Sequence, residues 1–339
     1  MTQSRPHPST LSVAIALGIV YVVWGSTYLA IAYVVETLPP FLAAGARFLV
    51  AGGLLLAYLV AQDRWRRRRR NAPRLERPRL VEWRTALIVG ALLLLGGNGM
   101  VMVAERTVPS GIAAVIIATV PIWMSVFDAL LTRRRPSLLA IGGLLVGVVG
   151  VAILLLPTDG VATIDPFGIA LLVVATVSWA AGSLYARHGP LPRNDLLGTG
   201  MEQFAGGVTL ALVGLAVGEL GRTDLGAVST ASIIGLVYLV VFGSLVAFTA
   251  YVWLLNHVAV TTVATYAYVN PIVAVALGML FRSEQLSLRT LLAAALIIGA
   301  VVAMVTGRPR EAEEPGPQPE MAPLEPHERD VRDEAGQPS

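Results

Sequence analysis

The chain has 339 residues, of which 55% are hydrophobic and 14% are charged, and its formal net charge is +3. Soluble proteins carry about 25% charged residues, so this composition, with charges bunched between long apolar stretches, excludes an ordinary soluble domain and predicts a membrane protein. The chain has no cysteine, which excludes a disulfide framework, a thiol nucleophile and a thiolate metal site.

The N-terminal residues 1–10 are polar, contain Arg5 and lead directly into a long apolar segment. A cleavable signal peptide has an apolar core of only about 7–15 residues and a small-residue cleavage site. Leu11–Val35 is longer and runs through Trp24 and Tyr28 without such a site. We therefore expect a retained first helix after a cytoplasmic N-terminus.

Ten segments have the length of about 20 apolar residues that a helix needs to cross a bilayer. In chain order they are Leu11–Val35, Leu38–Ala61, Thr85–Ala104, Val108–Leu131, Ser137–Leu156, Asp165–Ala186, Leu196–Val217, Thr230–Leu255, Val258–Phe281 and Ser287–Thr306. The sequence thus predicts an all-α integral membrane protein with ten transmembrane helices.

Arginines gather in alternate loops, which predicts the orientation of the chain. The Arg-rich loops hold Arg64, Arg66 to Arg70, Arg74, Arg77 and Arg79, then Arg133 to Arg135, then Arg187 and Arg193; the opposite loops hold Glu36, Glu105, Arg106, Asp159, Asp165, Glu219, Arg222 and Asp224. Every basic residue is an arginine, a bias typical of GC-rich bacterial genomes. By the positive-inside rule, we expect a multi-pass protein of the bacterial inner membrane with both termini in the cytoplasm.

Residues 308–339 are rich in proline and acidic residues and have almost no large apolar side chain. Such a segment cannot bury enough surface to fold. It is therefore expected to be a disordered cytoplasmic tail, which either is a plain solvated extension or has a regulatory or partner-binding role.

The chain also repeats itself. Val-Pro-Ile at 120–122 matches Asn-Pro-Ile at 270–272, and Arg-Phe at 47–48 with Ala-Gly-Gly at 51–53 matches Gln-Phe at 203–204 with Ala-Gly-Gly at 205–207. A unit of five spans is odd, so the second copy enters the membrane from the other side. The expected architecture is two inverted halves, 11–156 and 165–306, around a central site that can face either side; an inherited duplication without a transport role is the alternative.

Two polar positions lie inside apolar segments. Arg47 is costly there unless it is paired or hydrated, so it either faces the central cavity and binds an anionic group or a carboxylate, or forms a structural ion pair or reaches the headgroups. Glu202 and Gln203 occupy the repeat-related place. Glu202 is the candidate proton-coupling carboxylate because burial favours its protonated form, unless it simply lies at the cytoplasmic boundary.

Aromatic and hydroxyl side chains predict a substrate-binding wall. Tyr21, Trp24 and Tyr28 share one face of the first segment. Further candidates are Ser26, Thr27, Trp179, Ser183, Tyr266 and Asn270. Rings beside small residues can contact an apolar solute while hydroxyls orient it; the alternative is plain packing.

Prolines and small residues predict movement and close packing. Pro121 and Pro271 lie within apolar segments and are candidate hinges, or harmless kinks. The patterns Gly143-x-x-x-Gly147 and Ala295-x-x-x-Gly299 permit close helix contact, within one chain or across a homodimer. Asn98 needs a polar partner and serves either as packing or as a substrate contact.

Catalytic constellations are missing from the sequence. The four histidines make no metal-binding spacing, and there is no phosphate-binding loop. We therefore expect no enzymatic activity, no metal, no cofactor and no nucleic acid. The expected partners are a small-molecule substrate and membrane lipids, with anionic lipids as a contact for the arginine run at 66–70.

The stretch Tyr21-Val-Val-Trp-Gly-Ser-Thr-Tyr28, with Ala46-Arg47-Phe48, resembles the EamA branch of the drug/metabolite transporter superfamily, in particular exporters whose first helix carries WGSTY. The resemblance covers residues 11–306. It implies ten helices in two inverted EamA repeats and export of amino acids, other metabolites or toxic compounds. It also places the following residues at or near a central cavity: Trp24, Ser26, Thr27, Tyr28, Arg47, Trp179 and Gln203.

The predicted function is a secondary exporter of small metabolites, either amino acids or amphiphilic and toxic compounds. It is expected to work by alternating access and to draw on a proton gradient or on the solute's own gradient. The rival predictions are a passive uniporter or facilitator, a membrane-embedded enzyme or lipid-handling protein, and a scaffold that acts through its tail.

Overall fold

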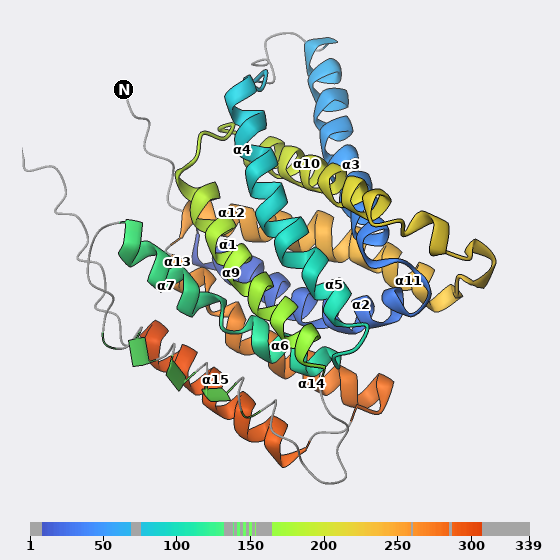
Figure 1. The fold of residues 1–339 in the computed structure, drawn as a ribbon. Coiled ribbons are helices and arrows are strands. Elements are labelled where there is room, and N and C mark those ends of the chain that lie inside the picture. Colours follow the sequence, from blue (N-terminus) through green and yellow to red (C-terminus); the bar gives the residue numbers. More distant parts are fainter. Residues whose placement is uncertain are drawn as a thin grey trace, which may run out of the picture. The chain divides into compact units, whose positions relative to one another are not determined.

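The computed structural model describes residues 9–68, 76–131, 165–258, 260–284 and 287–306, with isolated positions between 138 and 153. This part of the chain is all-helical and contains no strand (Figure 1). Several predictions concern residues outside this part: the tail 308–339, residues 1–8, the stretch 69–75, Arg133 to Arg135, Gly143 and Gly147, and most of the fifth segment.

The helices follow one another with short connections. Their bounds are α1 Thr10–Ile19, η1 Val20–Trp24, α2 Gly25–Thr37, α3 Pro40–Arg68, α4 Leu80–Gly90, η2 Ala91–Gly99, α5 Met100–Ala104, α6 Ser110–Ile117, α7 Val120–Leu131, α9 Pro166–His188, α10 Asp195–Ala216, α11 Thr230–Tyr238, η5 Leu239–Phe248, α12 Thr249–His257, α13 Val260–Val263, α14 Tyr266–Arg282 and α15 Leu288–Thr306. Two single 3-10 turns, η3 Leu220–Arg222 and η4 Leu225–Ala227, lie between α10 and α11.

Seven helical stretches are long and apolar enough to cross a membrane. They are Thr10–Thr37, Pro40–Arg66, Leu80–Ala104, Ser110–Leu131, Pro166–His188, Asp195–Ala216 and Thr230–His257, and they coincide with the first four predicted segments and with the sixth to the eighth. The apolar stretches Val269–Arg282 and Leu288–Gly299 are shorter, and they lie in the predicted ninth and tenth segments. The complete set of ten spans stays a prediction.

Polar residues at the helix starts explain several boundaries. The side chains of Ser9, Asp165, Asn194 and Ser229 each accept a backbone N–H of the first turn that follows. These N–H groups have no partner within the helix. Pro166 lies in the first turn of α9, where its missing N–H costs no hydrogen bond.

The helix that was predicted over Val108–Leu131 is broken. α6 ends at Ile117, and α7 begins at Val120 after a turn. Pro121 therefore lies in the first turn of a new helix, whereas Pro271, its repeat partner, lies inside α14. The two prolines thus have different local settings, and their role as hinges stays a prediction.

Two long π-helical stretches occupy corresponding places in the two predicted halves. η2 spans Ala91–Gly99 in the third predicted segment, and η5 spans Leu239–Phe248 in the eighth. A π-helix is rare and is often found at functional sites. Hydropathy does not distinguish it from an α-helix, so the sequence gave no sign of it.

Glycines bring the repeat-related helices α3 and α10 into close contact (Figure 1). A Cβ atom at Gly52 would lie 2.5 Å from the backbone nitrogen of Phe204, and one at Gly207 would lie 2.6 Å from the backbone nitrogen of Leu49. Both glycines come from the repeated Ala-Gly-Gly motif. The motif therefore lets the two backbones touch.

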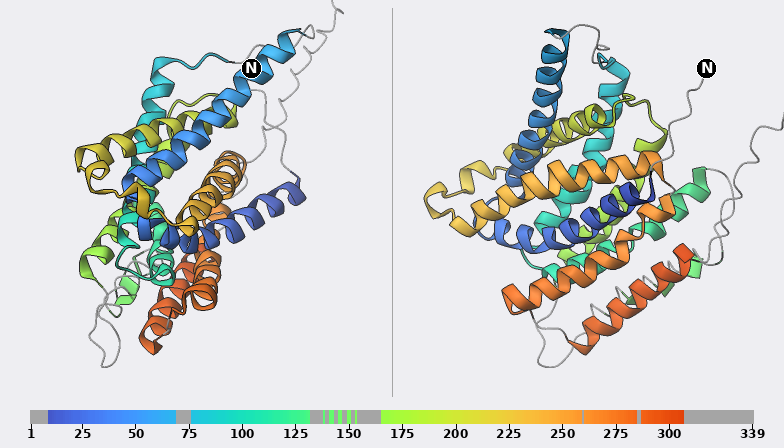
Figure 2. Two further views of the ribbon diagram at one scale, coloured as in Figure 1. Left: turned by 90° about the vertical axis from the view of Figure 1, so that its right-hand side faces the viewer. Right: turned by 180° about the vertical axis from the view of Figure 1, so that it is seen from behind.

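The small residues of α15 behave differently. α14 and α15 lie side by side in all views (Figures 1 and 2), but Ala295 and Gly299 are exposed, and a Cβ atom at Gly299 would meet nothing within 4 Å. The prediction that this pattern packs within the chain is wrong for the described residues. A contact between two chains remains the other interpretation.

Replacing Gly52 by alanine should destabilise the protein by about 1–3 kcal/mol, because the added methyl group overpacks a backbone contact that cannot move aside. The neighbouring Gly53 is a matched control, since a Cβ atom there meets nothing within 4 Å. Gly53→Ala should leave the melting temperature of the purified protein unchanged or slightly higher. Equal losses for both variants would contradict the proposed contact.

Candidate functional site

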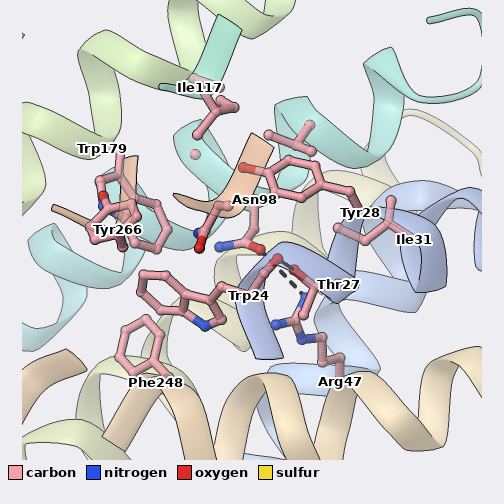
Figure 3. Close-up of a pocket in the computed structure, with 14 residues that line it drawn as sticks. Trp24, Thr27, Tyr28, Ile31, Arg47, Asn98, Ile117, Trp179, Phe248 and Tyr266 are labelled. Carbon is pink, nitrogen blue, oxygen red and sulfur yellow. Dashed lines mark hydrogen bonds between the residues drawn. The ribbon is translucent and has the colours of Figure 1, made fainter. Parts of the chain in front are cut away.

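A pocket lies where helices of both predicted halves meet. It is lined by Trp24, Thr27, Tyr28, Ile31, Arg47, Gly97, Asn98, Val101, Ile117, Ala175, Trp179, Phe248, Tyr266 and Asn270 (Figure 3). Its volume is about 60 Å³. A water molecule needs roughly 10–15 Å³ by this measure, so the pocket as it stands has room for a few waters and not for a metabolite.

Aromatic rings make one wall of the pocket. Trp24 is packed edge-on against Trp179 and Tyr266, with ring centroids 5.4 Å and 5.5 Å apart. The indole N–H of Trp24 donates to the carbonyl oxygen of Gly243 at 3.3 Å, and that of Trp179 donates to the hydroxyl of Tyr251 at 3.3 Å. With its polar edges satisfied, the wall presents ring carbon to the pocket.

Arg47 places a positive charge beside this wall, on α3. Its side chain is 3% exposed. Nε donates to Ser244 Oγ at 2.7 Å, and Nη1 donates to Asn98 Oδ1 at 3.4 Å. Within the described part of the chain, Nη2 has no hydrogen-bond partner and no carboxylate forms an ion pair with this guanidinium, so the predicted alternatives of a structural ion pair and of headgroup contact are not observed.

Ser244 joins the two repeat-related polar residues. It lies in η5, and besides its hydroxyl contact with Arg47 its carbonyl oxygen accepts the side-chain N–H of Gln203 at 3.2 Å. Asn98, the other partner of Arg47, lies in η2. The two π-helices therefore supply the groups that orient the guanidinium. Sequence reasoning missed Ser244, although Gly-Ser at 243–244 and Gly-Asn at 97–98 are similar pairs.

Three of the predicted binding residues do not line the pocket. The hydroxyl of Ser26 bonds to the carbonyl oxygen of Val23 and to the hydroxyl of Tyr238, both within 2.8 Å. Ser183 bonds to Tyr251 at 2.8 Å. Gln203 is fully buried against Ser244, one helix away from the cavity. In this structure these residues hold helices together.

The other predicted residues come together as expected in space: Trp24, Thr27, Tyr28, Arg47, Trp179, Tyr266 and Asn270. Asn270 is the polar member on α14, and its Oδ1 atom is buried without a partner among the described residues. The pocket thus holds a guanidinium donor and a free amide acceptor beside an aromatic wall.

Glu202 lies outside the pocket, on the face of α10 that meets α4. A Cβ atom at Gly90 would lie 2.7 Å from the carbonyl oxygen of Glu202. The side chain of Glu202 is 1% exposed, and its Oε2 atom has no partner in the described part of the chain. The alternative that Glu202 sits in solvent at a boundary is therefore not supported.

Comparison with known proteins identifies the family. The model of the EamA-like transporter family matches residues 11–156 and, separately, residues 166–306.

The chain belongs to the EamA-like transporter family. This EamA protein is 40% identical over 294 residues to the uncharacterized inner membrane transporter YedA of Escherichia coli, with 86% of the chain and 90% of YedA covered. It is 27% identical over 286 residues to protein PecM of Dickeya dadantii, with 83% of the chain and 88% of PecM covered. These relatives place it in the drug/metabolite transporter superfamily.

A solved structure supports the fold of this EamA protein. One crystal structure aligns with a TM-score of 0.59 at 20% identity, covering 88% of this chain and 97% of the other. At this identity the likeness concerns the fold alone. The family and the names of its relatives indicate a membrane transporter rather than an enzyme.

Ser244→Ala should lower the free energy of unfolding by about 1–3 kcal/mol, because it leaves the buried Nε of Arg47 without an acceptor. Thr249→Val is the matched control in the next helix, since Thr249 Oγ1 is buried without a partner among the described residues. Thermal unfolding of the purified protein should show a loss for the first variant only. A comparable loss for Thr249→Val would mean that hydroxyl removal itself, and not the Arg47 contact, is responsible.

Proposed function

We propose that the chain is a secondary exporter that moves a small metabolite across the inner membrane of a bacterium by alternating access. Its architecture would be ten helices in two inverted repeats, 11–156 and 165–306. The separate family matches over 11–156 and 166–306 support this arrangement. So do the paired π-helices η2 and η5 and the meeting of Arg47 and Gln203 at Ser244.

The observation that carries the proposal is the buried guanidinium of Arg47, which faces the pocket without a carboxylate partner in the described part of the chain. A charge in this setting is costly until it meets an opposite charge. A planar carboxylate is the natural ligand, because it accepts two parallel N–H groups of a guanidinium. The proposed solute therefore carries an anionic group.

The rest of the pocket narrows the solute class. Asn270 Oδ1 can accept a hydrogen bond from an ammonium group, and the rings of Trp24, Trp179 and Tyr266 suit an apolar or aromatic body. An amino acid or a similar amphiphilic metabolite satisfies all three features. The small volume of the pocket fits a state without solute, so the halves would move apart to admit one.

The proposed orientation puts both termini and the Arg-rich loops in the cytoplasm. The end of the bundle that carries Glu36, Glu105, Glu219 and Glu284 would then face the periplasm; we call it the carboxylate end. The similarity to an inner membrane transporter supports the location.

A passive facilitator is the second candidate. No aspartate or glutamate is among the residues that line the pocket in the described part of the chain, and this favours transport down the solute's own gradient. Glu202, buried on α10, is the proposed proton-coupling carboxylate of the first candidate.

The test begins with metabolite profiling of the medium of cells with and without the gene, followed by uptake of the exported solute into liposomes. Arg47→Gln should weaken the apparent affinity for a carboxylate solute by roughly 10- to 100-fold, as expected for a lost charged hydrogen bond of about 1.5–3 kcal/mol. Arg47→Lys should retain part of it, since lysine keeps the charge but not the fork. Unchanged affinity in Arg47→Gln would contradict the proposed site.

The same liposomes separate the two candidates. Proton flux that follows solute flux and disappears in Glu202→Gln identifies coupled transport. Solute flux without proton flux identifies a facilitator.

A further inference from the structure

Two carboxylates of the second predicted half cap helices of the first. Glu219 accepts the backbone N–H groups of Phe41 and Leu42 at the start of α3, at 3.1 Å and 2.8 Å. Glu284 accepts those of Ser110 and Gly111 at the start of α6, at 3.1 Å and 3.2 Å. Negative charge is favourable at a helix N-terminus, so both contacts fasten the carboxylate end.

The two caps are built in the same way. The residue before each glutamate has a left-handed backbone, with φ of 76° at Gly218 and 52° at Ser283. Each turn ends a helix and sends the chain back, so that Glu219 N–H reaches the carbonyl of Gly214 and Glu284 N–H reaches that of Gly278. Ser283 adopts a conformation that favours glycine.

A third contact joins α2 and α14 at this end. Arg282 forms an ion pair with Glu36 and lies over the ring of Tyr33. The hydroxyl of Tyr33 donates to the carbonyl oxygen of Phe281 at 3.1 Å. The carboxylate end is thus closed by polar contacts between helices that belong to different predicted halves.

Glu105 lies among these contacts but takes part in none of them. It follows α5 directly, its side chain is 7% exposed, and neither carboxylate oxygen has a hydrogen-bond partner among the described residues. Its neighbour Arg106 lines a depression of about 360 Å³ at the carboxylate end, together with Glu36 and Glu219. On its other side, Glu105 interacts electrostatically with Tyr28 of the central pocket.

The charges around Glu105 do not neutralise it. Burial raises the pKa of the Glu105 carboxyl well above its usual range, the nearby charge of Glu284 raises it further, and Arg282 opposes the shift in part. The titratable or charged groups on the elements around Glu105 are Tyr28, Tyr33 and Glu36 on α2, Arg47 on α3, Asp165 at the start of α9, and Tyr266, Arg282 and Glu284 on or after α14, with Arg106 next in the chain. Asp165 is occupied elsewhere, because it accepts Thr107 Oγ1 and the N–H of Phe167.

We propose that Glu105 is a proton-binding site that keeps the carboxylate end closed while it is protonated and releases that end when the proton leaves. A buried carboxylate without donors, beside a second carboxylate, is costly, whereas the protonated acid carries no charge there. Opening would hydrate the carboxylate and remove the cost. The part of this inference that concerns transport rests on the proposed carrier function; the proton site itself does not.

The direction of the pH effect follows from linkage. The closed end binds the proton at pH values where the open end has already lost it, because the pKa of Glu105 is raised only in the closed arrangement. Closure is therefore most stable at low pH and weakens as the pH rises toward the raised pKa. In the proposed orientation, protons of the periplasm would favour closure on that side.

The proton site can be tested on the purified full-length protein in lipid nanodiscs, without any solute. Dicyclohexylcarbodiimide reacts with protonated carboxyl groups in apolar surroundings, and mass spectrometry of peptides locates the adduct. We expect Glu105 to be modified at neutral pH and to lose reactivity as the pH rises. Asp165 is the control at the same end, since hydrogen bonds from Thr107 and the N–H of Phe167 lower its pKa, and it should stay unmodified.

Glu284→Gln supplies a second measurement, because it removes the neighbouring charge. The midpoint of Glu105 modification should fall by about one pH unit. An unmodified Glu105 at neutral pH, or a midpoint that Glu284→Gln leaves in place, would overturn the proposal. Protection of Glu105 by sodium at constant pH would also overturn it, in favour of a cation site.

The gating part uses a reporter cysteine in this cysteine-free chain. Ile31→Cys lies in the pocket wall, and its rate of labelling by a hydrophilic thiol reagent is compared with and without Glu105→Gln, which mimics the protonated state. The ratio of the two rates cancels the pH dependence of the thiol. It should be near one at low pH and rise several-fold at high pH; a constant ratio would overturn the gate. Loss of transport in Arg47→Gln bears on the carrier alone, so the two proposals can fail separately.

Discussion

The buried guanidinium of Arg47 is the constraint on which the arrangement of the pocket depends. A charge inside an apolar helix bundle must be compensated, and here neutral dipoles do so in part, through Ser244 Oγ at 2.7 Å and Asn98 Oδ1 at 3.4 Å. Both partners lie on π-helical stretches. Glycines such as Gly52 let α3, which carries Arg47, touch α10 of the other predicted half. The polar centre therefore requires helices from both halves.

Dipoles stabilise a guanidinium less than a carboxylate does. Arg47 thus keeps a preference for an anion, and a solute that supplies one changes the electrostatics of the interface between the halves. A ligand shifts a conformational equilibrium only through such differential interaction. Glu105 offers a similar argument for a proton at the carboxylate end. Two buried ionisable groups without counter-charges, at different depths, would then respond to solute and to pH.

Much of the scaffold could be predicted from the sequence, because the length of an apolar segment reports a span directly. The Trp-Gly-Ser-Thr-Tyr stretch and Arg47 led to the pocket, and the repeated Ala-Gly-Gly motifs mark the contact between α3 and α10. The directions of Ser26 and Ser183 could not be predicted, since hydroxyls one residue apart on a helix point to different neighbours. Ser244 was missed because a serine in an apolar run carries no signal until its partner is known. Glu105, Glu219 and Glu284 likewise are ordinary loop charges in the sequence, and their roles depend on helix ends distant in the chain.

The binding preference of Arg47 can be measured without knowing the natural solute. Purified protein is heated in the presence of amino acids and of the corresponding amino acid amides, which keep the side chain and the ammonium group but lack the carboxylate. A ligand that binds the folded state raises the melting temperature. The account predicts that at least one amino acid stabilises the protein, that its amide does not, and that the effect disappears in Arg47→Gln. Equal stabilisation by acid and amide, or an effect that survives in Arg47→Gln, would contradict it.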